Sequence, residues 1–406
     1  MRLNPNSLAM TGLLASLTAL GPLATDIYVP SLPQIARVFG GSTASAQFTI
    51  TGYLMGFAVG QIIYGPLSDK YGRRPVVLFG LALYIAATLA CIFAASIDAL
   101  VGARVVQALG AAAPIILSRA IVRDLYEGAR AARQFAQMSM IIGVTPIGAP
   151  VLGGFLQSWY GWQASFVVML ITGAAIAAGV IFLLPETNTH KQEGPLSLGK
   201  IITSFGIVAR NRAYLSYLGI QACCYNGLFA FVSASSVVMQ GSYGLAPTQF
   251  GFVFAICASS FVFGAWLGSR LVSRRGLEGM IRLGVACLCA GGLLQIAALA
   301  LFPHSIAALV IPEMLYFIGV GFLLPNTLAA AMTPFPERAG AASSLMGFAQ
   351  MTSGALVGSL LGALLGESAW PLAIVTAIAG VGGFVIFHLS KDARRATITH
   401  SGNLVR

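Results

Sequence analysis

Long stretches of the chain contain almost only apolar residues, and the polar residues are grouped in short segments between them. An apolar stretch of about 20 residues can cross the hydrocarbon core of a bilayer as a helix. In the two longest uncharged runs, turn-like sequence at 157–163 and 241–249 separates neighbouring helices. The pattern predicts twelve spans, at 8–29, 46–66, 76–95, 99–121, 134–157, 164–184, 213–239, 248–269, 279–301, 305–331, 339–365 and 370–389.

Composition supports an all-α integral membrane protein. Of the 406 residues 57% are hydrophobic and 9% are charged, whereas a soluble domain has about 25% charged residues. The formal net charge is +11. Of the 23 Lys and Arg residues, all but Arg37 and Arg104 lie on the two tails, the even-numbered loops or the adjoining helix ends. This positive-inside pattern predicts that both termini are cytoplasmic and gives no reason to expect a nucleic-acid partner.

The predicted spans form two halves of six. A polar and then amphipathic linker, 185–212, separates an N-terminal half (1–184) from a C-terminal half (213–390), and a cytoplasmic tail (391–406) follows. The halves resemble each other: "GPLSDKYG" (65–72) aligns with "SRLVSRRG" (269–276), and Arg104 corresponds to Glu313. Duplicated halves are typical of transporters that alternate access to a central site. A channel does not need this repeat. An enzyme would need a nucleophile or metal cluster that the spans lack, so we expect no enzyme activity, metal or cofactor.

The first cytoplasmic loop reads "GPLSDKYGRRP" (65–75). Gly65 and Pro66 are expected to end the second span, Gly72 to allow the chain to reverse, and Arg73 to anchor the third span. A short basic loop of this kind can simply follow the topology rule. Alternatively, Asp69 can face the positive end of a helix.

The fifth span contains "GVTPIGAPVLGG" (143–154). Small residues allow helices to approach closely in lipid, and prolines kink or soften a helix. Close packing alone could explain this composition. The residues concerned are Gly143, Pro146, Gly148, Pro150, Gly153 and Gly154.

Two ionisable residues of the first half lie in apolar sequence. Asp26 is the only charged residue between Arg2 and Arg37, and Arg104 lies in the fourth span, with Gln107 one turn further along the same helix face. A charge at the centre of a membrane helix costs about 2.5 kcal/mol or more, so such residues are candidates for function. They could form a buried ion pair that only stabilises the fold. Alternatively, Asp26 carries a proton, and Arg104 favours its ionised form.

Glu313 in the tenth span is a third buried charge. It could be a second proton site, a contact for cationic substrates, or a protonated and hydrogen-bonded residue with no role in transport.

These motifs resemble those of the major facilitator superfamily. The loop 65–75 is similar to the family's signature between spans 2 and 3, which implies a cytoplasmic latch made by Asp69, Arg73 and Asp124 with the helix that begins near Gly340. The fifth-span pattern is similar to the antiporter signature of exporters in that family. An acidic residue in span 1 and Arg-x-x-Gln in span 4 recur in its proton-driven drug exporters. A proton-coupled importer would share the fold and the loop but should lack the fifth-span pattern.

Four runs, "TDIYVPSLP" (25–33), the loop 65–75, "SRAIVRD" (118–124) and "SSLMGFAQ" (343–350), resemble the bicyclomycin-resistance and chloramphenicol/florfenicol-exporter branch. The resemblance implies a bacterial inner-membrane exporter that exchanges small hydrophobic drugs for protons, and we expect it to act as a monomer. The alternative is proton-coupled transport of an endogenous metabolite, outward or inward. It also implies a cavity lined by spans 1, 2, 7 and 11, with the candidates Tyr28, Tyr53, Tyr225, Asn226, Phe229, Phe348 and Gln350. Gln107 in span 4 is a further candidate for substrate binding.

Overall fold

The computed structural model describes residues 7–188, 198–364 and 368–394, and within these ranges all regular secondary structure is helical. The chain forms two compact units. The first contains Met1–Leu196 and Ala246–Ala255, and the second contains Ser197–Leu245 and Ile256–Arg406. The predicted all-α class is therefore confirmed for the part of the chain that the structure describes. Residues 189–197 of the predicted linker and 395–406 of the predicted tail lie outside the described residues.

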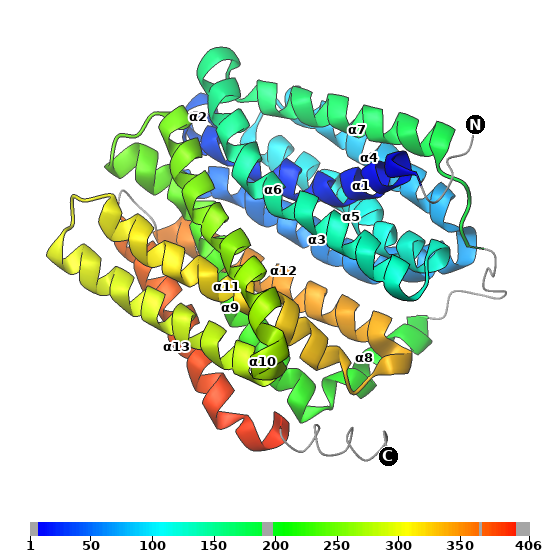
Figure 1. The fold of residues 1–406 in the computed structure, drawn as a ribbon. Coiled ribbons are helices and arrows are strands. Elements are labelled where there is room, and N and C mark those ends of the chain that lie inside the picture. The colour runs from blue at the N-terminus through cyan, green and yellow to red at the C-terminus, as the bar shows by residue number, and fades with distance from the viewer. Residues whose placement is uncertain (1–6, 189–197, 365–367, 395–406) are drawn as a thin grey trace. The chain divides into compact units, whose positions relative to one another are not determined.

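The helices of the first unit lie side by side and are drawn from blue to green-cyan in Figure 1. α1 packs against α5, α6 and α7, while α5 packs against α3 and α4. These helices are α1 (Leu8–Asp26), the 3₁₀ turn η1 (Val29–Ser31), α2 (Leu32–Val38), α3 (Thr43–Tyr71), α4 (Arg73–Ile92), α5 (Ile97–Leu125), α6 (Gly128–Tyr160) and α7 (Gln163–Leu183).

In the second unit, α9 packs against α11, α12 and α13, and α8 packs against α12. The helices are α8 (Leu198–Ala209), α9 (Arg212–Val237), the π turn η2 (Val238–Ser242), α10 (Pro247–Leu301), whose first residues belong to the first unit, α11 (Ala307–Met332), the 3₁₀ turn η3 (Pro336–Arg338), α12 (Ala339–Leu364) and α13 (Trp370–Leu389).

The described residues contain 11 helices that are long and apolar enough to span a membrane, whereas the sequence predicts twelve. The difference lies in α10, whose 55 residues include the predicted spans 248–269 and 279–301. Gly276, between those spans, has φ 66° and ψ 173°, which is not a helical conformation. Dividing α10 there gives twelve spans. The cytoplasmic location of both termini stays a prediction.

The second span does not end at Gly65 and Pro66 as expected. α3 continues through both residues to Tyr71, and the chain turns at Gly72, where φ is 101°. A proline inside a helix removes only its own N–H bond and bends the axis, so the helix can resume beyond it. A φ of 101° suits glycine because it has no Cβ. Asp69 therefore lies in the last turn of α3 and not in a loop.

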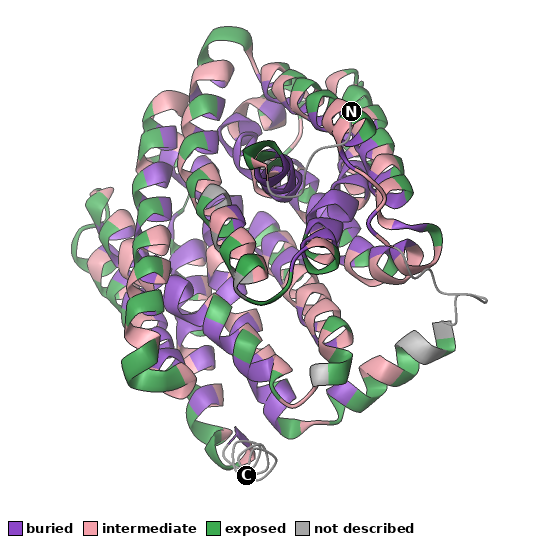
Figure 2. Ribbon diagram, turned by 45° about the vertical axis from the view of Figure 1, so that its right-hand side comes forward, coloured by how far each residue is buried: buried purple, intermediate pink, exposed green. Residues whose placement is uncertain are grey.

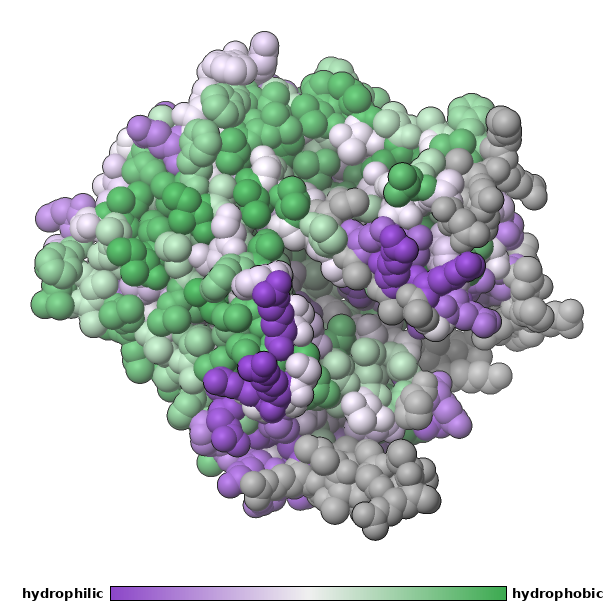
Figure 3. Space-filling model, viewed as in Figure 1, coloured by the Kyte–Doolittle hydropathy of each residue, from purple (hydrophilic) through white to green (hydrophobic). Residues whose placement is uncertain are grey.

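Apolar side chains cover much of the face shown in Figure 3, and hydrophilic side chains form separate groups on it. Phe79 and Ile378 are among the large apolar side chains on the surface, with 59% and 67% of their area exposed. Buried residues lie along the helix sides that face neighbouring helices, as Figure 2 shows. This distribution fits helices whose outer sides contact lipid.

Candidate functional site

The first span is broken in its middle. α1 ends at Asp26, the turn η1 follows, and α2 continues to Val38, so the candidate span is Leu8–Val38 and not 8–29. Pro30 has no N–H to bond the Asp26 carbonyl four residues earlier, which stops the helix there. Asp26 therefore lies at an internal helix break, further from the end of the span than the sequence suggests. Broken helices with free backbone groups form the binding sites of many transporters.

Arg104 on α5 is completely buried and bonds to the broken span. Its Nη1 donates to the carbonyl oxygen of Ala24 (3.1 Å), in the last turn of α1, and to Gln107 Oε1 (2.6 Å). The last turn of a helix leaves carbonyl groups without N–H partners, and Arg104 satisfies one of them. Arg104 Nε and Nη2 are buried without a hydrogen-bond partner.

Three aromatic rings surround the Arg104 guanidinium group. Its carbon lies 4.3 Å from the ring centre of Tyr53, 4.7 Å from that of Tyr28 and 5.7 Å from that of Phe166. Rings at these distances attract a cation through their electron-rich faces, and more strongly where water is excluded. The rings therefore stabilise a buried cation that lacks a carboxylate partner.

Asp26 is also buried, with 7% of its surface exposed. Its Oδ1 accepts a hydrogen bond from the Thr25 hydroxyl at 3.0 Å. Among the described residues no ion pair joins Asp26 to Arg104. The structure thus places the two groups at the same helix break without the direct pairing that the sequence suggested as one possibility.

A second set of polar groups holds Gln107 in place. Its Nε2 donates to Thr88 Oγ1 on α4 (2.7 Å), and Met169 Sδ on α7 lies 3.6 Å away. Sequence reasoning identified Arg104, Gln107, Tyr28 and Tyr53, which the structure brings together. It missed Thr88 and the aromatic residue Phe166 on α7, which reach the site through the packing of α4 against α5 and of α7 against α4 and α1.

Glu313 on α11 is completely buried in the second unit. Gln295 Nε2 on α10 donates to Glu313 Oε2 at 3.0 Å and to the Leu309 carbonyl at 3.2 Å. Oε1 of Glu313 is buried without a partner. Gln295 was not singled out in the sequence, because a glutamine in an apolar helix has many possible roles.

The other cavity candidates lie on α9 and α12 of the second unit. The rings of Tyr225 and Phe229 stack with centres 4.5 Å apart, and the Tyr225 hydroxyl lies 3.3 Å from Met351 Sδ. Asn226 Oδ1 is buried without a hydrogen-bond partner. Phe348 and Gln350 are half-buried on α12, the helix that carries Met351. Their part in substrate binding stays a prediction.

Arg73 joins the ends of three helices of the first unit. Its Nη1 lies 2.5 Å from Asp69 Oδ1 on α3 and 2.7 Å from Ser68 Oγ, and its Nε lies 2.9 Å from Asp124 Oδ2 on α5. Of the latch proposed on the basis of resemblance, Asp69 and Asp124 therefore both contact Arg73. The role of these residues as a latch stays a prediction.

Glu186, which follows α7, binds the start of α4. Its carboxylate accepts hydrogen bonds from the backbone N–H groups of Arg73 (2.8 Å) and Arg74 (3.2 Å), and also from those of Thr187 and Asn188. A carboxylate at a helix N-terminus is stabilised by unpaired N–H groups and by the helix dipole. Glu186, and not Asp69, provides this charge. Sequence reasoning missed Glu186, although an acidic residue directly after an apolar span was a signal that could have identified it.

Glycines of α6 allow close contact with two neighbouring backbones. A Cβ at Gly153 would lie 2.0 Å from the Ile27 carbonyl oxygen, and one at Gly154 would lie 2.5 Å from the Pro247 carbonyl oxygen. Gly148 has open space around it, and Pro146 lies inside the helix. Thus Gly153 packs directly on the break that contains Asp26. Pro150 is buried in the same helix, and Gly143 lies one turn before Pro146.

Residues 14–358 match the family model described as the Major Facilitator Superfamily. The chain belongs to this superfamily. Three bacterial relatives have names that refer to drug resistance. A bicyclomycin resistance protein homolog of Haemophilus influenzae is 31% identical over 88% of this chain and 90% of that protein. Multidrug resistance protein D of Escherichia coli is 31% identical over 88% of both chains. A chloramphenicol resistance protein of Pseudomonas aeruginosa is 29% identical over 91% of this chain and 87% of that protein.

Solved structures of transporters share the fold of this superfamily member. A peptide transporter in complex with alafosfalin has a TM-score of 0.75 and 16% identity, covering 95% of this chain and 93% of that chain. A D-xylose-proton symporter has a TM-score of 0.72 and 14% identity, covering 93% of this chain and 98% of that chain. The family match and the bacterial relatives identify a multi-pass transporter of the bacterial inner membrane and not an enzyme, and the solved structures show that the fold is shared.

Proposed function

We propose that this transporter exports small hydrophobic molecules in exchange for protons, and that Asp26 carries the proton. The observation that supports this most strongly is the pair of buried groups at the break in α1. Asp26 accepts a hydrogen bond from Thr25 and has no cationic partner among the described residues. Arg104, bonded two residues away to Ala24, has two nitrogens with no partner.

The arrangement allows Asp26 two states. In the neutral, protonated state the carboxyl group needs no cation, which is compatible with the separated geometry described above. In the ionised state it needs one, because a single buried charge is costly. The unpartnered N–H groups of Arg104 can supply two or more hydrogen bonds to it after a change of side-chain rotamer. Proton loss would then draw the broken span toward α5.

Proton exchange can be linked to transport through this movement. We infer that a proton from the outer side neutralises Asp26 and releases it from Arg104 while substrate leaves, and that proton loss to the cytoplasm restores the pair. One charge that crosses a potential of 100 mV contributes about 2.3 kcal/mol. The rings of Tyr28 and Tyr53 are buried against Arg104, and they would contact a small hydrophobic substrate once movement of the broken span uncovers them.

The relatives' names suggest amphenicol-like or bicyclomycin-like substrates. The test is efflux of chloramphenicol from proteoliposomes with an imposed pH gradient. We expect transport that follows the pH gradient in the parent and no gradient-driven transport in Asp26→Asn. ATP-dependent transport without a gradient would contradict the proposal.

Glu313 is the second candidate for the proton site, because one of its carboxyl oxygens is buried without a partner. If Asp26→Asn keeps gradient-driven efflux and Glu313→Gln loses it, the proton site lies in the second unit. A proton-coupled transporter of an endogenous metabolite remains the alternative function, and failure to transport any drug tested, with proton coupling intact, would favour it.

A further inference from the structure

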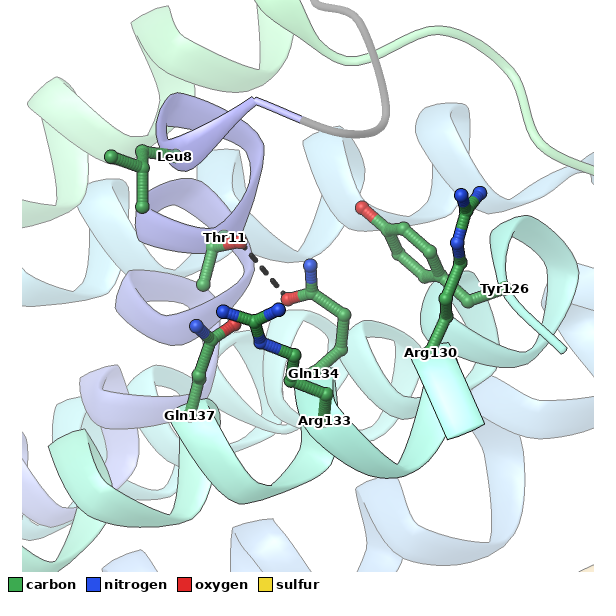
Figure 4. A pocket seen from close by; sticks show the side chains of 7 residues that line it. All are labelled: Leu8, Thr11, Tyr126, Arg130, Arg133, Gln134 and Gln137. Atoms are coloured by element: carbon green, nitrogen blue, oxygen red, sulfur yellow. Dashed lines mark hydrogen bonds between the residues drawn. The ribbon is translucent and has the colours of Figure 1, made fainter. Parts of the chain in front are cut away.

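A polar cavity of about 400 Å³ lies between α1 and α6 at the start of both helices. Figure 4 shows Arg133, Gln134 and Gln137 extending from α6 toward Thr11 on α1. The Thr11 hydroxyl donates to Gln134 Oε1 at 3.0 Å and links the two helices. Leu8, Tyr126 and Arg130 complete the lining. Neither the break in α1 nor the latch residues contribute to it, so the proposed transport mechanism does not account for this cavity.

The lining carries two positive charges and no negative one. Arg130 and Arg133 take part in no ion pair or side-chain hydrogen bond among the residues that the structure describes. The nearest acidic residue along the chain, Glu127, does not line the cavity. Both arginines line the hollow together with the amides of Gln134 and Gln137, and Figure 4 shows their guanidinium groups at different parts of it. Guanidinium and amide N–H groups are the donors that phosphate oxygens accept.

The cavity lies where two membrane spans begin. The candidate spans start at Leu8 on α1 and at Arg133 on α6. Lipid headgroups occupy the layer at the ends of the spans, and the positive-inside pattern predicts that this end is cytoplasmic, where anionic lipids attract basic residues.

Apolar side chains continue the same face of α6 into the span. Met140 and Val144 follow Arg133 and Gln137 at helical spacing, and they are 72% and 63% exposed. Leu8, at the edge of the cavity, is 85% exposed. A phosphate site that continues into exposed apolar surface suits an amphipathic ligand better than a free anion.

We propose that the α1–α6 cavity binds the phosphodiester headgroup of an anionic membrane lipid, with Arg130 and Arg133 on the phosphate and an acyl chain along Met140 and Val144. A lipid bound there would hold the start of α6 against α1. Because α1 and α6 also meet at Gly153 and Ile27, the lipid would stabilise the whole helix pair. The inference does not depend on the substrate or on proton coupling.

The experiment measures thermal unfolding of the purified full chain in phosphatidylcholine nanodiscs that contain increasing fractions of phosphatidylglycerol. The test variant is Arg130→Gln/Arg133→Gln. Its matched control is Arg274→Gln/Arg275→Gln, which removes the same charge from two exposed arginines that line no described cavity. Both variants should melt like the parent in pure phosphatidylcholine.

We expect phosphatidylglycerol to stabilise the parent, since a ligand that binds only the folded state raises its stability. The apparent affinity for this lipid should fall by about tenfold in the test variant and by about twofold or less in the control. Gln137→Glu, which places a negative charge in the cavity, should also weaken lipid binding. This variant replaces the double variant in the experiment if the double variant does not fold.

Three results would overturn the inference. One is the absence of any stabilisation of the parent by phosphatidylglycerol beyond phosphatidylcholine. Another is an equal loss in the test and control variants, which would show general attraction to an anionic surface. The third is equal stabilisation by soluble glycerol phosphate, which would show an anion site that does not select lipid.

Discussion

The two units of the chain carry opposite charges at corresponding positions, Arg104 on α5 and Glu313 on α11. Both residues are completely buried, and each is bonded to a glutamine. In the first unit the polar contacts continue to Thr88 on the neighbouring helix α4, and in the second they reach Gln295 on α10. The same place in the fold therefore holds a cation in one half and an acid in the other.

The surroundings of the two charges differ. Arg104 has three aromatic rings around it and a broken helix beside it, at the end of which lies a second ionisable group, Asp26. The helix that corresponds to α1 in the second unit is α9, which is regular from Arg212 to Val237 and contains no acidic residue. Among the described residues, the first unit therefore has a buried acid and a buried arginine beside a break within a span, and the described surroundings of Glu313 contain no such combination. This difference leads us to assign proton exchange to the first unit.

The two units also differ in how the segment after the last span is bound. In the first unit, Glu186 after the last span binds the start of α4. In the second, Arg394 after the last span donates to Glu278 Oε1 on α10 at 3.0 Å, and Tyr217 donates to the same oxygen at 2.9 Å. Each unit thus fastens the segment after its last span to the start of its third span. In the first unit the acid lies on that segment and binds backbone N–H groups, and in the second the acid lies on the third span and binds an arginine.

The largest expected effect comes from removing each buried acid in turn. Asp26→Asn should reduce gradient-driven efflux to the level of protein-free liposomes, because asparagine cannot exchange a proton. Glu313→Gln should keep most of the activity, since an amide can replace the carboxyl group in its bond with Gln295. Efflux of one drug from proteoliposomes under the same pH gradient compares the two. An equal loss of efflux in both variants would contradict the assignment of proton exchange to the first unit alone.

The next largest effect concerns the packing of α6 on the helix break. Gly153→Ala should destabilise the protein by about 1–3 kcal/mol, the cost of overpacking, because the added Cβ would lie 2.0 Å from the Ile27 oxygen. Gly148→Ala in the same helix is the control. It meets nothing within 4 Å and should be neutral or stabilise the helix by up to about 1 kcal/mol. Thermal unfolding in detergent measures both, and a stable Gly153→Ala would show that the contact is not tight.

A smaller effect is expected at the end of the first unit. Glu186→Gln should lower the stability by about 1–2 kcal/mol, because the hydrogen bonds to the N–H groups of Arg73 and Arg74 lose their charge. Glu127→Gln is the matched control, since Glu127 precedes α6 but makes no side-chain hydrogen bond to its start. Equal melting temperatures for the two variants would argue against the contact. Arg394→Gln tests the corresponding contact in the second unit.

The smallest effect is expected for Asp69→Asn. The Asp69 side chain is 40% exposed, and Arg73 keeps its bond to Asp124 in its absence. An exposed ion pair contributes about 0.2–1 kcal/mol, so turnover should fall by no more than about fivefold while substrate affinity stays the same. Transport rates measured across a range of drug concentrations separate the effect on turnover from the effect on affinity. A tenfold loss of affinity at unchanged turnover would place Asp69 in the binding site.

Much of the fold could be predicted because apolar length and charge placement directly reflect the bilayer. Helix ends were harder: α3 continues past Pro66, and α1 breaks at Asp26 within one apolar run, because backbone geometry near proline depends on local packing. Arg104, Gln107 and Tyr53 were found because ionisable or aromatic residues in such a context are unusual. Thr88 was missed because a threonine in an apolar helix has many possible roles, and Glu186 was missed because its contact joins segments that are far apart in the sequence.

The central claim is that Asp26 binds a proton whose release is coupled to substrate. It can be tested directly by adding substrate to the detergent-solubilised protein in weakly buffered solution near neutral pH and recording proton release with a pH dye. The parent and Glu313→Gln should release protons on substrate addition, and Asp26→Asn should release none. Proton release from Asp26→Asn equal to that of the parent would contradict the account and leave Asp26 with a structural role only.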